Sequence, residues 1–220
     1  MLSSTEENYI KSIFKLSGRS HKNVSTNAIA DDLQTSAASV TDMIKRLSEK
    51  NMVEYAKYKG TVLTREGEAV AKLLIRKHRL WEVFLVQHLG FNWDEVHEIA
   101  EQLEHIQSQT LTEKLDEFLQ FPKVDPHGDP IPDAEGNIIY EEQLPLAEFK
   151  VGESGVIIGV KDTSSSFLQH LDKIGIGLGS RIEVKEEVEY DKSRVITIDG
   201  KKERAISNQV ALNLLMQSKR

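Results

Sequence analysis

Residues 25–50, STNAIADDLQTSAASVTDMIKRLSEK, contain two short helical patterns separated by a tight turn. Ser25 and Ser36 are each placed to cap one of these helices, and we expect the second to run to about Lys50. Apolar residues recur at helical spacing in both patterns: Ile29, Ala30, Leu33, Val40, Met43, Ile44 and Leu47. Two short helices joined in this way predict a helix-turn-helix.

A β-hairpin is predicted directly after these helices. Residues 52–56 and 61–64 have the composition of strands, and Gly60 lies in the turn between them. A hairpin appended to a helix-turn-helix is a wing. Its tip carries Lys57 and Lys59, which we expect to contact the phosphates of a nucleic acid.

Further helices are predicted on both sides of this unit. Residues 4–17 have a helical pattern, in which Ser4 and Glu7 have the spacing of a capping box. A long helix over residues 65–88 ends at Gly90. Two more helices are expected after it, over residues 92–106 and 109–119.

The composition of the sequence changes after residue 120. Proline and glycine residues interrupt any regular pattern as far as Pro145, which predicts a linker. Short strand patterns follow over residues 155–160, 180–185 and 194–198, with a short helix over residues 167–174. Several short strands at this spacing predict a small barrel. We therefore expect a mainly α protein with a small β part, divided into domains 1–72, 73–145 and 146–220.

Composition places the chain among ordinary globular proteins, because 39% of its 220 residues are hydrophobic and 29% are charged. The absence of cysteine excludes a disulfide framework, a thiol nucleophile and a Cys-ligated metal site. There is no phosphate-binding glycine motif, no recognisable catalytic Ser-His-Asp set, no apolar run long enough for a membrane helix and no secretory-signal pattern. We therefore expect a cytoplasmic protein without a membrane partner.

The net charge of −7 is distributed unevenly. Residues 1–79 hold 14 basic and 9 acidic residues, whereas residues 80–150 hold 3 basic and 16 acidic ones. A basic head suits a polyanion such as DNA, and an acidic middle part either concentrates cations or is simply solvated.

Metal-ligand residue types cluster in the acidic middle part. On the helix expected over residues 92–106, one arc away from the apolar side carries His97, Glu101, Glu104 and His105. On the preceding helix, His78 and Glu82 are four residues apart and share a face. Imidazole and carboxylate donors without thiolate suit manganese, ferrous iron or zinc. A solvated polar face gives the same pattern, so spacing alone leaves both interpretations open.

Two enzyme signatures are incomplete here. His97-Glu98 with Glu101 is similar to the start of a zincin motif, but the second histidine is missing. A di-iron helical bundle needs histidines three residues after its glutamates, and neither Glu98 nor Glu101 has one. We expect no catalytic residues and no small organic substrate.

The order of these parts resembles the diphtheria toxin repressor family of metal-dependent transcriptional regulators, which includes the manganese transport regulators. The resemblance covers essentially the whole chain and is carried by residues 76–82 (RKHRLWE), 97–105 (HEIAEQLEH) and 126–132 (PHGDPIP). It implies a winged helix-turn-helix head, a helical metal-binding and dimerisation domain, and an SH3-like C-terminal barrel.

The resemblance also implies two metal sites. The ancillary site would take His78, Glu82 and His97, with Asp162 as the nearest candidate from the barrel. The other site would take Glu101, Glu104 and His105 together with Asn8 from the first helix. The manganese branch has aspartate where this chain has Asn8, and it has an acid three residues further on, where this chain has Lys11. That departure puts a two-manganese cluster in doubt.

The metal implied is Mn²⁺, with Fe²⁺ as the alternative, while Zn²⁺ or Co²⁺ could also bind in vitro. The head would read double-stranded DNA with the first turns of the second helix of the helix-turn-helix. Small side chains there permit close approach to bases, and basic ones hold phosphate. The residues expected at this interface are Ser36, Ala37, Ala38, Ser39, Thr41, Asp42, Lys45 and Arg46, with Lys57 and Lys59 of the wing.

We therefore expect a homodimeric repressor of metal-uptake genes, in which a divalent ion favours the spacing of the two heads that fits an operator. Without metal, Glu101, Glu104 and neighbouring acids would repel one another and the head would move more freely. The alternatives are a metal-dependent hydrolase with an accessory domain and a winged-helix regulator with an organic effector.

Overall fold

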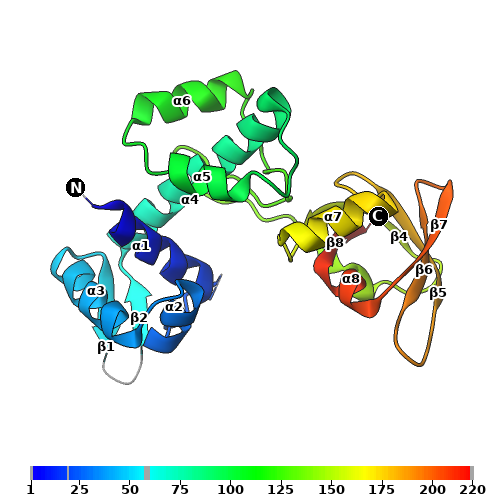
Figure 1. Ribbon diagram of the computed structural model, residues 1–220, viewed down its shortest axis with the longest axis horizontal. Helices are drawn as coiled ribbons and strands as arrows, with labels where there is room; N and C mark the ends of the chain where they lie inside the picture. Colours follow the sequence, from blue (N-terminus) through cyan, green and yellow to red (C-terminus); the bar gives the residue numbers. More distant parts are fainter. Residues whose placement is uncertain (1, 19, 57–59, 219–220) are drawn as a thin grey trace.

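The computed structural model describes residues 2–18, 20–56 and 60–218, and it has three parts along the chain (Figure 1). An N-terminal head leads through one long helix into a helical middle part, and a C-terminal domain built on a sheet follows (Figure 1). None of the described helices combines the length and the apolar character needed to cross a membrane.

The head is a helix-turn-helix with a wing, as the sequence predicts. Its elements are α1 (Ser4–Ser17), α2 (Thr26–Asp32), α3 (Ala37–Glu49), β1 (Val53–Ala56) and β2 (Gly60–Leu63). Ser25 and Ser36 cap α2 and α3 by accepting backbone N–H groups three residues on. The cap of α1 differs from expectation, because Ser3 rather than Ser4 is the N-cap and its capping-box partner is Glu6 rather than Glu7.

The wing hairpin is held to the head by its own backbone. β1 and β2 are antiparallel, and Val24 adds two backbone hydrogen bonds of 2.8 and 2.9 Å to Thr61. Gly60 is required there, because its φ is +101° and a Cβ would lie 2.6 Å from the carbonyl oxygen of Val24. Lys57 and Lys59 lie outside the described residues.

The helical middle part consists of α4 (Arg65–Leu89), α5 (His97–Leu103) and α6 (Gln109–Phe118). Thr64 caps α4, and Gly90 ends it in the left-handed conformation. The expectation of one helix over residues 92–106 is wrong in its bounds. The carbonyl of Trp93 accepts a 2.8 Å hydrogen bond from Nε2 of His127, so that carbonyl is used for a tertiary contact.

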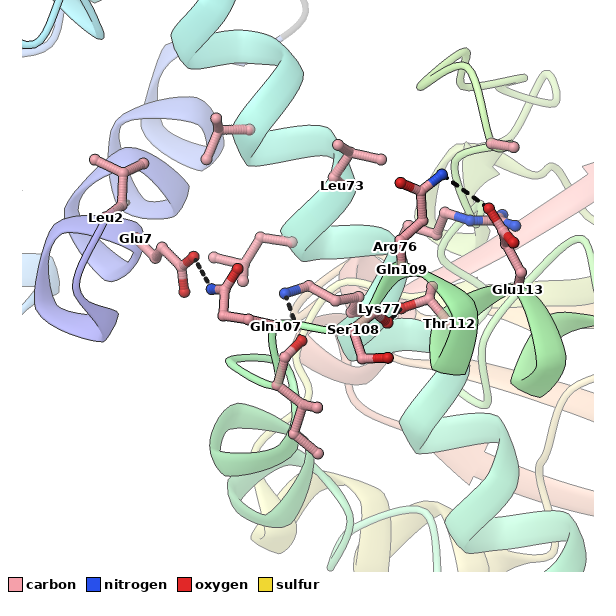
Figure 2. A pocket seen from close by; sticks show the side chains of 14 residues that line it. Leu2, Glu7, Leu73, Arg76, Lys77, Gln107, Ser108, Gln109, Thr112 and Glu113 are labelled. Carbon is pink, nitrogen blue, oxygen red and sulfur yellow. Dashed lines mark hydrogen bonds between the residues drawn. The ribbon is translucent and has the colours of Figure 1, made fainter.

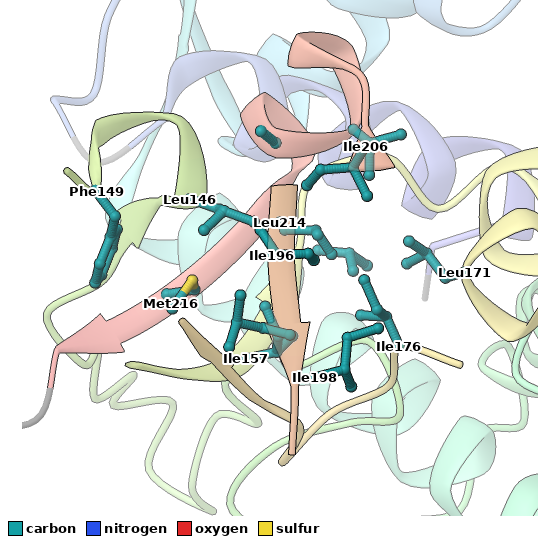
Figure 3. Close-up of a cluster of buried hydrophobic side chains, with 14 of the residues drawn as sticks. Leu146, Phe149, Ile157, Leu171, Ile176, Ile196, Ile198, Ile206, Leu214 and Met216 are labelled. Carbon is teal, nitrogen blue, oxygen red and sulfur yellow. The ribbon is translucent and has the colours of Figure 1, made fainter. Parts of the chain in front are cut away.

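The C-terminal domain is a six-stranded antiparallel sheet in the order β3-β8-β4-β5-β6-β7. Its elements are β3 (Leu144–Pro145), η1 (Leu146–Glu148), β4 (Ser154–Val160), α7 (Ser165–Ile174), β5 (Arg181–Glu187), β6 (Arg194–Ile198), β7 (Lys202–Ile206), α8 (Asn208–Asn213) and β8 (Leu214–Ser218). Leu146, Ile157 and Leu214 are among the side chains that meet in its core (Figure 3).

The predicted linker is an ordered loop that joins the middle part to this domain. The backbone N–H of Val160 donates to the carbonyl of His127, and that of Ile131 donates to Lys123. At Gly128, φ is +89° and a Cβ would lie 2.0 Å from the carbonyl oxygen of Ile158. Only glycine lets the loop approach β4 so closely.

Candidate metal centre and DNA-recognition surface

Four of the predicted ligands converge where α4 meets α5. His78 and Glu82 lie one turn apart on α4, and Nε2 of His78 is 2.9 Å from Oε1 of Glu82. His97, the first residue of α5, places Nδ1 3.4 Å from the same oxygen. One donor atom from each of His78, His97 and Glu101 lies within 4.8 Å of the other two. These residues therefore have the chemistry and the proximity of a metal centre.

The charges in this cluster are mutually compensated. Burial disfavours the charged carboxylate of Glu82, but the surrounding imidazoles of His127, His78 and His97 hold its pKa well below the usual range. Burial likewise opposes protonation of His78, yet its hydrogen bonds to Glu104 and Glu82 raise its pKa. A metal ion needs a free imidazole nitrogen, so its binding would release the proton that these interactions favour on His78.

A second group of ligand types adjoins the first and was missed by the sequence analysis. Glu82, Asp125 and His127 are all buried, and their donor atoms lie within 4.8 Å of one another. Burial and the charges of Glu82 and Asp129 raise the pKa of Asp125 to about 7. Burial opposes the charged form of His127, but the Glu82 carboxylate raises its pKa to about 9. The only signal in the sequence was the loop at residues 126–132, which carried the resemblance but no assigned role.

The ligands expected for the other site lie at the joint between the head and α5. Glu104, the C-cap of α5, is fully buried, and Nδ1 of His78 lies 2.7 Å from its Oε2. Its Oε1 and the Oδ1 of Asn8 are buried without a hydrogen-bond partner. His105 lies beyond the end of α5, with Nδ1 2.6 Å from Glu7 of α1 and Nε2 3.9 Å from Oε1 of Glu104. The unpartnered Oε1 of Glu104, which lies near the His105 imidazole, and the unpartnered Oδ1 of Asn8 are both oxygens suited to a cation.

Lys11, which stands where the resemblance implies an acid in the manganese branch, lies at this joint. Its Nζ donates to Glu101 at 2.6 Å and to Glu104 at 2.5 Å, and it lies 3.3 Å from Nδ1 of His78. The expectation that unpaired acids repel one another there needs correction, because the ammonium lies between the two carboxylates. Burial opposes ionisation of Glu101, but the charge of Lys11 lowers its pKa.

Asp162 is placed in the turn before α7. Its Oδ1 accepts the backbone N–H of Ser164. Among the described residues it belongs to neither group of potential metal ligands.

A cavity of about 530 Å³ lies beside the joint (Figure 2). Leu2 and Glu7 of the head line one side, Leu73 and Lys77 of α4 line the floor, and α6 lines the far side (Figure 2). Glu7 lies at the edge of this cavity, where the Oε1 of Glu7 accepts a 2.7 Å hydrogen bond from the side chain of Gln107. Glu7 thus ties α1 to the segment after α5 through two partners.

The expected DNA-reading residues form one exposed strip on α3 and its N-cap. All eight of the described ones are exposed: Ser36, Ala37, Ala38, Ser39, Thr41, Asp42, Lys45 and Arg46. Several of them already have local partners: the hydroxyls of Ser36 and Ser39 lie 2.9 Å apart, Thr41 donates to the carbonyl of Ala37, and Lys45 lies 3.4 Å from Asp42. The opposite side of α3 is buried through Val40, Ile44 and Leu47.

Three family models match the chain in the order of its three parts. Residues 1–61 match the N-terminal DNA-binding domain of iron-dependent repressors, and residues 64–133 match their metal-binding and dimerisation domain. Residues 144–217 match the FeoA domain. This order defines the class as a metal-responsive repressor with a FeoA-type, SH3-like C-terminal domain.

Relatives and solved structures agree with this class. The chain is 33% identical to the iron-dependent repressor IdeR of Mycobacterium leprae over 128 residues, 58% of this chain and 55% of IdeR. It therefore spans little more than half of that relative. It is 32% identical to the regulator MntR of Oceanobacillus iheyensis over 120 residues, 54% of this chain and 80% of MntR.

Solved structures also match nearly the whole chain. A manganese-dependent transcriptional repressor in complex with manganese has a TM-score of 0.86 and 33% identity, covering 97% of this chain and 100% of that one. ScaR with bound Zn²⁺ has a TM-score of 0.76 and 32% identity, covering 97% and 99%. The chain belongs to the iron-dependent repressor family of metal-dependent transcriptional regulators, which includes the diphtheria toxin repressor and MntR.

Proposed function

We propose that this chain is a homodimeric regulator that represses genes for metal uptake when a divalent cation is bound. The observation that carries the proposal is the joint between the DNA-reading head and the metal-ligand cluster. Glu7 and Lys11 of α1 contact Glu101, Glu104 and His105 of α5 and its end, and Asn8 on the same helix has a buried, unpartnered Oδ1. A cation bound there would therefore act directly on the position of the head.

The residues that would hold a cation are His78, Glu82 and His97 at one site, and Asn8, Glu104 and His105 at the other. Glu101, which the resemblance assigns to the second site, has a donor atom close to His78 and His97, so we propose it for the first. When bound, the ion supplies positive charge that favours the approach of these carboxylates and does no covalent chemistry. His78 and Glu104 touch both sites, because Nδ1 of His78 lies 2.7 Å from Oε2 of Glu104. Occupancy of one site is thus expected to affect the other.

Mn²⁺ is the metal we favour, with Fe²⁺ as the alternative. Every candidate donor is an oxygen or an imidazole nitrogen, and oxygen donors suit Mn²⁺ by geometry rather than by raw affinity. Among similar proteins, one solved structure is a repressor in complex with manganese and another holds Zn²⁺. Binding of Zn²⁺ or Co²⁺ in vitro would therefore not identify the physiological metal.

The head would bind double-stranded DNA through the exposed strip of α3, with Lys45 and Arg46 on phosphate. A dimer presents two such strips, and its two-fold symmetry suits a palindromic operator with half-sites about one helical turn apart. The FeoA-type domain would modulate the ancillary site or the dimer. A regulator of this kind acts where the DNA lies, so we propose the cytoplasm.

The test is a titration of metal-free protein with Mn²⁺, Fe²⁺, Zn²⁺ and Co²⁺ in separate experiments, each followed by selection of bound duplexes from a random-sequence DNA pool. Salt must be fixed, because the phosphate contribution to affinity depends strongly on it. We expect the protein to select a palindromic DNA sequence when Mn²⁺ or Fe²⁺ is present, and to release that DNA when a chelator removes the metal. Enrichment that is the same with and without metal would contradict the proposal.

The two alternatives predict different results. A hydrolase would turn over esters or peptides in a chelator-sensitive way. A regulator with an organic effector would gain no thermal stability from Mn²⁺ or Fe²⁺, since a ligand bound only by the folded state must stabilise it. The cavity beside Glu7 is where such an effector would be sought.

A further inference from the structure

Lys11 is a buried lysine whose surroundings are those of a metal ion. Only 9% of its side chain is exposed, and its Nζ lies 2.6 Å from Glu101, 2.5 Å from Glu104 and 3.3 Å from the ring nitrogen of His78. Two carboxylates and an imidazole around one positive charge are the donor set of a hard or borderline cation. Burial of an ammonium is costly unless it is paired, and here both carboxylates pair with it.

Glu104 has a different environment at each of its oxygens. Its Oε2 is taken by Lys11 and His78, whereas its Oε1 is buried, has no hydrogen-bond partner and lies 3.9 Å from His105. The Oδ1 of Asn8, one helical turn before Lys11, is also buried without a partner. One carboxylate thus has an ammonium at one oxygen and no hydrogen-bond partner at the other.

We propose that Lys11 is a built-in cation, which fills permanently one of two cation positions at the joint between head and middle part. The joint then takes up a single divalent ion, on the Oε1 side of Glu104. The ammonium already ties α1 to α5 without metal, so the head is partly ordered before the ion arrives. This inference rests on the proposed function for the ion, but the tether by Lys11 does not depend on it.

Two substitutions at Lys11 test the two halves of the proposal. Lys11→Glu replaces the built-in charge with a ligand, so we expect it to bind one more Mn²⁺ per chain than wild type. The readouts are equilibrium dialysis and the electron paramagnetic resonance signal of coupled Mn²⁺ pairs.

Lys11→Met removes the ammonium that forms the tether and keeps much of the aliphatic side chain. In chelator, we expect α1 amides to exchange about tenfold faster or more, because hydrogen bonds to charged groups are strong.

Lys15 provides the matched control, since it lies one turn later on α1 and is exposed. Lys15→Glu and Lys15→Met make the same charge changes outside the joint, and both should behave as wild type. Exchange of α1 in Lys11→Met equal to wild type in chelator would overturn the tether. Unchanged Mn²⁺ stoichiometry in folded Lys11→Glu would overturn the built-in cation. No Mn²⁺ uptake by wild type would instead remove the proposed function, while the exchange experiment would still decide the tether.

Discussion

At the scale of single residues, Gly128 controls how closely the loop after α6 can approach the C-terminal domain. Its φ is +89°, and a Cβ would lie 2.0 Å from the carbonyl oxygen of Ile158. The neighbouring His127 is buried against Glu82, so the loop links the sheet domain to the metal-ligand cluster. A displaced loop would therefore disturb both parts.

Gly128→Ala should destabilise the protein by about 2 kcal/mol or more beyond the backbone strain alone, the size of effect that overpacking has. Gly152→Ala is the control, because its φ is +87° and its Cβ would have nothing within 4 Å. Urea unfolding of the metal-free variants measures the difference. An equal loss of unfolding free energy in the two variants would show that the close approach of Gly128 to Ile158 does not add to the cost of the substitution.

Glu6 connects two helices of the head. It closes the capping box of α1 and accepts a 2.7 Å hydrogen bond from Nζ of Lys50 at the end of α3. These interactions with Lys50 and with the backbone of Ser3 hold its pKa below the usual value of 4.5.

A carboxyl group with a lowered folded-state pKa stabilises the protein above its unfolded pKa, and that stabilisation is lost as the pH falls through the folded value. Glu6→Gln should therefore be less stable than wild type at pH 7, and the gap should narrow as the pH falls below 4.5. Thermal unfolding across pH measures this gap. A gap that is constant with pH would show that the charge of Glu6 does not contribute.

Helical spacing showed that His78 and Glu82 share one face of α4, but the expectation that they form a site with His97 came from the family resemblance. Helical spacing did not predict Lys11, His127 or Asp125 as their neighbours. Those residues come from other elements, and their positions depend on tertiary packing. Local pattern does not distinguish Lys11 from the exposed Lys15 on the same helix, and only the family resemblance singles out its position.

At the scale of elements, α1 contributes to two parts of the protein. Its apolar side packs in the core of the head, and its polar side faces the candidate metal centre. Ile10 and Ile13 are fully buried in the head, whereas Glu7 and Lys11 bond to residues of α5 or its end. The same fourteen-residue helix therefore transmits any change at the joint to the DNA-reading surface. Asn8 is the position on α1 where a stronger metal donor could be introduced without changing the apolar contacts of Ile10 and Ile13 or the polar contacts of Glu7 and Lys11.

Asn8→Asp should raise the affinity for Mn²⁺ roughly tenfold, the order by which partners around a metal tune its binding. The new carboxylate places a charge where the Oδ1 of Asn8 is buried without a partner, so the metal-free protein should become less thermostable. Calorimetry measures the affinity, and Asn27→Asp on the exposed side of α2 is the control. Unchanged Mn²⁺ affinity would remove Asn8 from the ion's immediate partners.

Element boundaries were predicted well where a cap marks them and poorly elsewhere. Ser25, Ser36 and Gly90 fix the ends of three helices as expected. The start of α5 was predicted at residue 92 instead of His97. The Trp93 carbonyl bonds to His127, and a contact between residues so far apart cannot be predicted from the local sequence. β7 was missed because its exposed residues are charged and lack apolar alternation.

At the scale of the whole molecule, the candidate ligands come from parts of the chain that meet at the joint. His78→Ala and Glu104→Ala should each weaken metal-dependent DNA binding by about 10- to 100-fold. Both side chains are buried at the joint, and Glu98→Ala on the exposed side of α5 should have no effect. Fluorescence anisotropy with the selected duplex measures affinity, and circular dichroism checks the fold. Normal affinity in both variants would show that the ligand assignment is wrong.

Coupling between the metal centre and the DNA surface must also work in reverse. If Mn²⁺ tightens DNA binding by some factor, thermodynamic linkage requires DNA to tighten Mn²⁺ binding by the same factor. The built-in charge of Lys11 lowers this factor, because part of the ordering of α1 precedes metal binding. We therefore expect Lys11→Met to show a larger ratio between DNA affinities with and without Mn²⁺ than wild type. The ratio comes from paired anisotropy titrations in Mn²⁺ and in chelator at one salt concentration. A ratio in Lys11→Met equal to or below that of wild type would mean that the ammonium does not share the ordering of the head with the metal.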